Sequence, residues 1–306
     1  MADFRTPYIS CRVCPHECGI DRRRRPSGFC GGKDTCRVAA ICRHAGEEPA
    51  VSGEKGVCNV FFAHCNMRCV YCQNHEISRP YAAAREMSVA EIAAEILRLL
   101  PSCENRVGFV SPSHYVPHVI EIVDRVREAG VNPVFIYNSN GYDRPEMLRL
   151  LEGRIDVYLP DFKYSDAVLA QQLSGVNHYP QAALKAIGEM YRQKGAPLWL
   201  DENGLAESGL IIRHLVLPGW VEQSVNVLRT IAEELSVKLH LSLMSQYYPP
   251  FEIPAFPSLN RSLRADEYDK VLESFFELGF SEGWMQSPDS THCHHPHFTG
   301  DEPFEW

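Results

Sequence analysis

From about residue 57 onward, short apolar segments with strand character alternate with longer segments whose apolar residues recur at the helical period. Repeated strand–helix units predict parallel strands joined by right-handed crossovers. The predicted fold is α/β, a partial (β/α)6 TIM-like barrel, and a doubly wound sheet is the competing architecture. The expected strands are 60–63, 107–110, 133–137, 155–159 and 237–243, and the expected helices are 89–100, 116–129, 145–151, 180–193, 221–235 and 265–278.

Two local signals support this division. Ser88-Val-Ala-Glu91 is a capping box that opens the helix at 89–100. The segment 198–217 is expected to form a hairpin that turns at Asn203-Gly204, because Asn-Gly favours the turns that join antiparallel strands.

The predicted strands end in clusters of polar residues. Residues 111–115 follow one strand, residues 137–141 end the next, and Asp161 and Lys163 follow the strand that Pro160 closes. In a barrel of parallel strands the active site lies at the rim formed by the carboxyl ends. This placement favours the barrel over the doubly wound sheet.

Three cysteines, Cys65, Cys69 and Cys72, follow the first of these strands at C-x3-C-x2-C spacing. One loop with this spacing can place three thiolates on three irons of a [4Fe–4S] cluster, which normally takes four protein thiolates. The fourth iron would then be open, which is the mark of a reactive metal site. The alternatives are a zinc loop or an ordinary ferredoxin-type cluster with a distant fourth cysteine, for which Cys58 is the candidate.

This loop resembles the cluster loop of the radical SAM superfamily, and the likeness extends to 46–49, 61–74 and 77–78. Over these segments the sequence is similar to proteins of the pyruvate formate-lyase-activating-enzyme-like type. The resemblance implies a partial barrel of radical SAM type that binds S-adenosylmethionine (SAM) at the open iron. It also implies reductive cleavage of SAM to a 5′-deoxyadenosyl radical, which abstracts hydrogen from a substrate. That substrate would be a glycyl residue of a partner protein, and the electron would come from a reduced flavodoxin or ferredoxin-type donor.

The resemblance also implies roles for residues at the strand ends. Tyr71 would pack on the adenine, and Lys163 would approach SAM. A Gly-Gly-Glu-type turn that supports the SAM amino group is replaced here by residues 111–115, so its contacts would come from Ser111, Ser113 or His114. The candidates for a monovalent cation site near the SAM carboxylate are Asn138, Ser139 and Asp161, with the carbonyl of Leu159.

Arg213 lies inside the second strand of the predicted hairpin, where a charged residue must be paired or must bind an anion. The SAM carboxylate is one plausible partner for its bidentate guanidinium. A protein carboxylate is the other, and the sequence leaves both interpretations open.

Residues 1–50 are interpreted as a cysteine-rich head, with Cys11, Cys14, Cys18 and Cys30 as one four-thiolate site. Few apolar residues lie here, so a metal is expected to supply folding energy. A closed site of this kind holds structural zinc or an electron-relaying iron–sulfur cluster, and spacing does not decide between them. Reduced, buried cysteines without a metal are the alternative. The basic run 22–25 is interpreted as a solvated loop face, with a docking patch for an acidic partner as the alternative.

The predicted barrel covers 51–285, and 286–306 form a histidine-rich tail. The tail carries His292, Cys293, His294, His295 and His297, which either hold a transition metal or have adventitious affinity for one. The net charge of -9 disfavours nucleic-acid binding. No apolar run is long enough to span a membrane, and the first residues lack the apolar core of a signal peptide, so we expect a cytoplasmic protein.

Two further functional interpretations stay open. The first keeps the radical chemistry but directs it at a small molecule, a lipid or an RNA. The second is a non-catalytic electron-transfer or zinc protein, which would cleave no SAM and would bind its cluster through four protein ligands.

Overall fold

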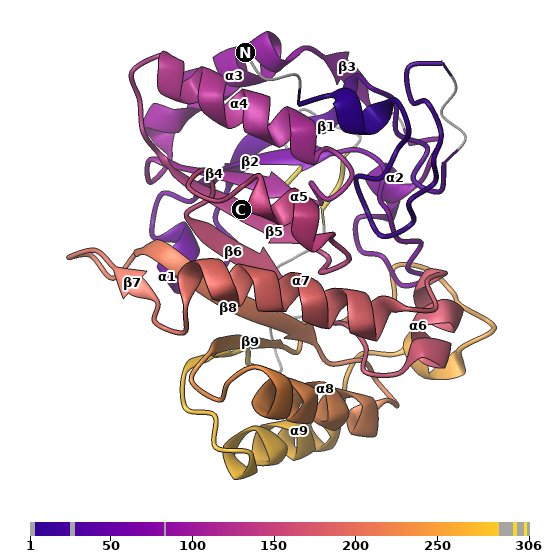
Figure 1. The fold of residues 1–306 in the computed structure, drawn as a ribbon. Helices are drawn as coiled ribbons and strands as arrows, with labels where there is room; N and C mark the ends of the chain where they lie inside the picture. Colours follow the sequence, from indigo (N-terminus) through magenta and orange to yellow (C-terminus); the bar gives the residue numbers. More distant parts are fainter. Residues whose placement is uncertain (1–3, 25–27, 83, 288–295, 299–302, 305–306) are drawn as a thin grey trace.

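The computed structural model describes residues 4–24, 28–82, 84–287, 296–298 and 303–304 (Figure 1). The strands are β1 (Cys36–His44), β2 (Val57–Phe62), β3 (Arg85–Met87), β4 (Arg106–Val110), β5 (Val134–Ser139), β6 (Val157–Pro160), β7 (Trp199–Leu200), β8 (Ala206–Leu215), β9 (His240–Met244) and β10 (Gly283–Met285). The α-helices are α1 (Pro49–Ser52), α2 (His75–Ser78), α3 (Val89–Leu99), α4 (Val116–Glu128), α5 (Pro145–Arg149), α6 (Ala167–Ser174), α7 (Tyr179–Lys194), α8 (Val221–Glu234) and α9 (Ala265–Glu277).

The strands form one sheet in the order β10-β9-β8-β6-β5-β4-β2-β1-β3, with β7 paired to β8 off this path. The strands β2, β4, β5, β6, β8, β9 and β10 are mutually parallel and follow chain order. Beyond β2, β1 pairs antiparallel with β2, and β3 pairs antiparallel with β1. A doubly wound sheet would reverse its strand order, and this one does not. Because β10 and β3 are its two ends, the sheet is not closed, and the predicted partial barrel is confirmed.

The helices cover one face of this sheet. In Figure 1, α3, α4, α5, α7, α8 and α9 follow one another over the near face, and α3 packs on α4 and α8 on α9. The capping box at the start of α3 forms as predicted: Glu91 N donates to Ser88 Oγ (3.2 Å), and Ser88 N donates to Glu91 Oε2 (2.7 Å). Every residue of β2 is buried, as expected for a parallel strand between a helical layer and the barrel interior.

Several elements lie outside the sequence-based expectations: β1, β3, α6 and β10. β1 falls within the predicted head, so the sheet begins at Cys36. Its apolar run, residues 38–42, is short and lies between arginines, and several of its side chains are partly exposed because the strand lies near the sheet edge. The hairpin of β7 and β8 forms as predicted, with Gly204 at φ 78° in its turn.

Within the basic run 22–25, Arg23 and Arg24 are exposed, as expected for a solvated face, and Arg25 lies outside the described residues, whereas Arg22 departs from that interpretation. Arg22 is only 1% exposed and lies between the rings of Tyr8 and Tyr115. The helices in the described ranges include none that is both long and apolar enough to cross a membrane.

Candidate active site

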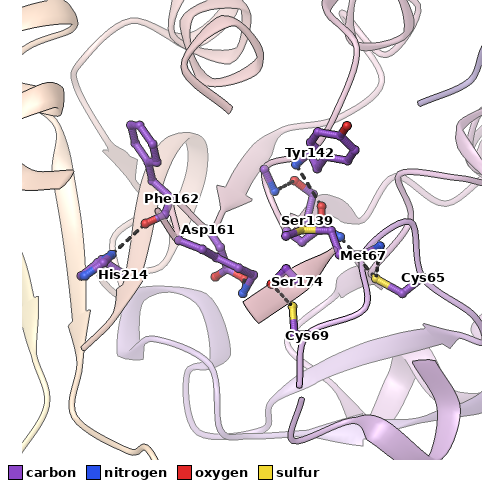
Figure 2. A network of polar contacts seen from close by, with 12 residues as sticks. Cys65, Met67, Cys69, Ser139, Tyr142, Asp161, Phe162, Ser174 and His214 are labelled. Carbon is purple, nitrogen blue, oxygen red and sulfur yellow. Dashed lines mark hydrogen bonds and ion pairs between the residues drawn. The ribbon is translucent and has the colours of Figure 1, made fainter. Parts of the chain in front are cut away.

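A cavity opens at the carboxyl ends of the parallel strands. Its walls come from the loop after β2, the ends of β4 and β5, the segment after β6 and the end of β8 (Figure 2). Segments far apart in the sequence meet here because the parallel strands all end at the same rim. The predicted site residues on this cavity are Cys65, Cys69, Tyr71, Cys72, Ser111, Asn138, Ser139, Asp161, Lys163 and Arg213.

The cysteine loop after β2 is anchored to two other parts of the barrel. On one side Arg68 N donates to Ser174 O at the end of α6 (3.0 Å). On the other side Asn66 Nδ2 donates to Tyr142 O, which follows β5 (2.7 Å). The loop is therefore held in place by backbone groups of the barrel itself.

Hydrogen-bond donors point at two of the three sulfurs. Cys65 Sγ accepts from Asn140 Nδ2 (3.3 Å) and from Met67 N (3.4 Å). Cys69 Sγ accepts from Ser174 Oγ (3.0 Å), which Figure 2 shows across the cavity wall. Hydrogen bonds to sulfur stabilise thiolates and tune the reduction potential of iron–sulfur clusters.

Burial raises the pKa of Cys65 to about 12, with a further contribution from the neighbouring Cys69. Burial also raises the pKa of Cys69, and the ammonium of Lys163 opposes this shift. Without a bound metal both thiols are therefore protonated at neutral pH. A metal ligated by these sulfurs would deprotonate them outright.

The donor set fits a [4Fe–4S] cluster. Among the residues that the structure describes, no three His, Cys, Asp or Glu side chains converge as the ligands of a single metal ion would. A cubane cluster makes a different demand, because each thiolate binds a separate iron. Three cysteines along one cavity, two with donors directed at their sulfurs, meet that demand.

Cys58 is not part of this set. It lies in β2, is fully buried, and its thiol is hydrogen-bonded to that of Cys103. It does not line the cavity. The structure therefore gives no support to Cys58 as a fourth cluster ligand.

Asp161 and Lys163 form an ion pair on the cavity wall, with 2.6 Å between Lys163 Nζ and Asp161 Oδ2. Burial would lower the pKa of Lys163, but the Asp161 carboxylate and the Cys69 thiol outweigh it and raise that pKa. The lysine is therefore charged at neutral pH. The pair lies beside the cysteine loop, not on a solvated helix face.

The ends of β5 and β6 are tied together behind this pair. The hydroxyl of Tyr179 lies 2.9 Å from both Asn140 O and Asp161 O. Gly141 has φ +74°, and a Cβ at this position would lie 2.1 Å from Asp161 O. Only glycine allows so close an approach of the two strand ends.

Arg213 lines the cavity, but its guanidinium is already paired. Nε donates to Glu48 Oε1 (2.8 Å), and a terminal nitrogen bonds to both Glu47 and Glu48. Burial would raise the pKa of Glu47, but Arg213 outweighs it and lowers the pKa to about 2. Of the two interpretations left open by the sequence, the structure shows pairing with protein carboxylates.

The turn after β4 only partly matches its expected role. Ser111 lines the cavity and has a positive φ of 55°, which is strained for a residue other than glycine. Ser113 and His114 are each 1% exposed and do not line the cavity. Of the three residues expected to support the SAM amino group, Ser111 is therefore the one that faces the cavity, and the contact itself stays a prediction.

The sequence analysis missed two residues of this site. His64 is 3% exposed, lines the cavity and has φ 71°, and neither ring nitrogen has a hydrogen-bond partner within the described ranges. Asn140 holds both Cys65 and the side chain of Asn66. The usable signal was position, since His64 directly precedes the first cysteine and Asn140 ends the polar cluster after β5.

The head cysteines form a separate group. Cys11, Cys14 and Cys30 are buried, Cys18 is partly exposed, and none of the four lines the cavity. In the tail, His292, Cys293, His294 and His295 lie outside the described residues. His297 is described, and its backbone N–H donates to Pro303 O (2.8 Å).

The chain is similar in sequence to a known protein and to one family model. An uncharacterized Methanocaldococcus jannaschii protein, MJ0674, is 28% identical over 277 residues, which cover 87% of this chain and 74% of that protein. Residues 59–229, more than half of the chain, match the model of the Radical SAM superfamily.

Of three solved structures that are similar at low sequence identity, only SuiB with its precursor peptide, at a TM-score of 0.50, bears on the fold. SuiB of Streptococcus suis, bound to the precursor peptide SuiA, has a TM-score of 0.50 at 10% identity over 73% of this chain and 47% of SuiB. The enzyme anSMEcpe with bound AdoMet gives 0.48 at 14% identity, over 70% of this chain and 57% of that one. A domain of pyruvate-formate lyase-activating enzyme from Bacteroides vulgatus gives 0.41 at 13% identity, over 56% of this chain and 93% of the domain. This chain thus spans about half the length of SuiB and anSMEcpe. With its partial barrel, its C-x3-C-x2-C loop on the rim cavity and the match over 59–229, the chain belongs to the Radical SAM superfamily.

Proposed function

We propose that this chain is a radical SAM enzyme that binds a [4Fe–4S] cluster at Cys65, Cys69 and Cys72, binds SAM beside it and removes a hydrogen atom from a substrate. The observation that carries the proposal is the convergence of these three cysteines with the polar ends of four strands on one cavity. When bound, the cluster and SAM supply a reductive cleavage that yields methionine and a 5′-deoxyadenosyl radical.

The cysteines are suited to hold a cluster that keeps one iron without a protein ligand. The cavity presents three thiols, and Cys58 is buried in the sheet against Cys103. Asn140 and Ser174 donate to two of the sulfurs and would stabilise the thiolates once a cluster is bound.

The charges on the opposite wall suggest how SAM is held. Arg213 is shared between Glu47 and Glu48, whereas Lys163 has the single carboxylate of Asp161. Lys163 is therefore the cation that we expect to meet the carboxylate of SAM. Asp161, with Asn138 and Ser139 at the end of β5, is the candidate cation site.

The substrate within this proposal is a glycyl residue of a partner protein, and the electron donor is a reduced flavodoxin or ferredoxin-type protein. The support is the sequence resemblance around the cluster loop to activating-enzyme-like proteins. A small molecule, a lipid or an RNA is the competing substrate class.

The first test is release of 5′-deoxyadenosine from SAM by the anaerobically reconstituted protein with dithionite. We expect multiple turnovers from the wild type and a loss of at least about 1,000-fold in Cys69→Ala, because one of three cluster ligands is missing. Cys36→Ala, which removes a buried cysteine in β1, is the matched control and should retain activity. A wild-type protein with a full cluster that releases no 5′-deoxyadenosine would contradict the proposal.

The substrate class is tested by following hydrogen transfer. Cells of the source organism are grown with deuterated glycine. Their extract is separated into macromolecular and small-molecule fractions, and each fraction is added to the reaction. Deuterium in 5′-deoxyadenosine with the macromolecular fraction, and its loss after protease treatment, would support a glycyl protein substrate. Deuterium transfer from the small-molecule fraction alone would contradict a glycyl protein substrate and support a small-molecule substrate.

A further inference from the structure

The four head cysteines are brought together by two short segments. The first is a closed loop, in which Cys11 N donates to Ile20 O (2.8 Å) and Gly19 N donates to Cys11 O (3.0 Å). The second is the turn 28–32, which lies on the first: a Cβ on Gly28 would be 3.2 Å from Cys18 Sγ. The thiols of Cys11, Cys18 and Cys30 all lie close enough to Cys14 to act on it electrostatically.

A buried cation faces this group. The guanidinium of Arg22 donates from Nε to Gly32 O (3.0 Å) and from Nη1 to His114 O (2.7 Å). Its Nη2 is buried and has no hydrogen-bond partner in the described part of the chain. A Cβ built on Gly32 would be 2.4 Å from this nitrogen and 3.4 Å from Cys30 Sγ, so the nitrogen and the sulfur approach the same point.

An arginine that is 1% exposed with an unused N–H is costly unless negative charge lies beside it. Protonated thiols are neutral and supply none. Four thiolates around a metal centre would supply a net negative charge at this point. A metal-bound form of the head would therefore supply the negative charge that the buried guanidinium of Arg22 needs.

We propose that Cys11, Cys14, Cys18 and Cys30 bind a second [4Fe–4S] cluster. Three of these cysteines lie in one eight-residue loop, at the reversed spacing C-x2-C-x3-C of the cavity loop, and the fourth is distant. Iron–sulfur sites recur with three cysteines in one loop and one remote ligand, whereas structural zinc sites are usually built from two pairs. With four protein thiolates this cluster has no open iron.

The head is connected to the cavity by a continuous chain of polar contacts. His16, inside the head loop, places Nε2 2.8 Å from Asn66 O. The side chain of Asn66 accepts from Asn140 Nδ2 (2.7 Å), which also donates to Cys65 Sγ (3.3 Å). A cluster in the head would therefore lie next to the cavity loop. A one-electron change in its charge would then act on a cluster bound in that loop.

Iron and sulfide analysis of the anaerobically reconstituted full chain tests this proposal and does not depend on SAM cleavage. We expect about eight iron and eight sulfide per wild-type chain, and about four of each in a Cys65→Ala/Cys69→Ala/Cys72→Ala variant. After reduction, that triple variant should give the electron paramagnetic resonance signal of a [4Fe–4S]+ cluster. Adding Cys14→Ala and Cys18→Ala to it should remove both the iron and the signal, while adding Cys36→Ala should leave them unchanged.

The iron content of the wild-type chain tests the proposal even where the variants fail to fold. About four iron per wild-type chain, zinc alone in the triple variant, or no metal there would each overturn the second cluster. Eight iron in a protein that releases no 5′-deoxyadenosine would support the head cluster while contradicting the proposed function, so the two failures are distinguishable.

Discussion

The cavity loop and the head loop have nearly the same cysteine pattern in opposite order, yet their surroundings differ. Cys65, Cys69 and Cys72 face a cavity lined by strand ends, and side-chain donors point at two of their sulfurs. The head cysteines are packed beneath a buried arginine, and backbone groups donate to two of their sulfurs, Gly32 N to Cys30 Sγ (3.3 Å) and His16 N to Cys14 Sγ. Spacing indicates that a cluster can be held, and the surroundings indicate whether it is open to a ligand.

The largest expected effect comes from the arginines next to the two loops. Arg22 is buried beside Cys30, whereas Arg68 is exposed and lies over the ring of Phe29 at 4.2 Å. Arg22→Met should lower the free energy of unfolding by about 3–5 kcal/mol, because a buried charge partner is removed from an anionic centre. Arg68→Met should lower it by about 1 kcal/mol or less, since an exposed cation–π contact is weak.

Anaerobic chemical denaturation of the reconstituted variants measures this difference. Equal effects of the two substitutions would show that the head is not a closed, charged site. The proposed difference between the head and the cavity loop would then be wrong.

Much of this architecture was predictable from local patterns. The capping box at Ser88, the hairpin turn at Gly204 and the alternation of strands and helices are short-range signals, and the structure follows them. The cavity residues were found because parallel strands bring their polar ends to one rim. For Cys65, Asp161 and Lys163, sequence position alone was enough to place them there.

The remaining features depend on long-range partners that no local pattern encodes. Arg213 pairs with Glu47 and Glu48, more than 160 positions earlier in the chain. Arg22 belongs to a basic run but is the member that turns inward, because Tyr8, Tyr115 and Gly32 surround it. Ser113 misses the cavity because the positive φ of Ser111 turns the chain inward after β4.

Stability should also depend on pH, because the wall behind the cavity contains a buried histidine. His214 Nδ1 lies 2.7 Å from Phe162 O (Figure 2). Its Nε2 lies 2.9 Å from Ser224 Oγ. Burial lowers the pKa of His214 to about 4, below its ordinary value of 6.5. The unfolded chain therefore binds this proton more readily than the folded one. The stability contributed by neutral His214 is complete above pH 6.5 and is lost as pH falls toward 4.

The expected slope from this group is at most about 1.4 kcal/mol per pH unit between pH 6.5 and 4. His214→Gln, whose amide can replace both hydrogen bonds, should flatten the curve over that range. Denaturation at a series of pH values measures it, and an unchanged slope in the variant would assign the pH dependence to other groups.

The smallest expected effect concerns a single donor and separates the two clusters directly. Ser174 Oγ donates to Cys69 Sγ (3.0 Å) and lies 2.6 Å from the hydroxyl of Tyr164. Removing this donor destabilises the more negative, reduced cluster, so Ser174→Ala should lower its reduction potential. A hydrogen bond worth about 1 kcal/mol corresponds to about 40 mV for one electron.

In a redox titration followed by electron paramagnetic resonance, only the midpoint potential of the cavity cluster should shift. Ser224→Ala, which removes a buried serine bonded to His214, should move neither midpoint. A shift of both midpoints in Ser174→Ala would mean that the two loops respond as one unit, through contacts such as those of Arg68, which donates from its side chain to Phe29 O in the head and from its backbone to Ser174 O.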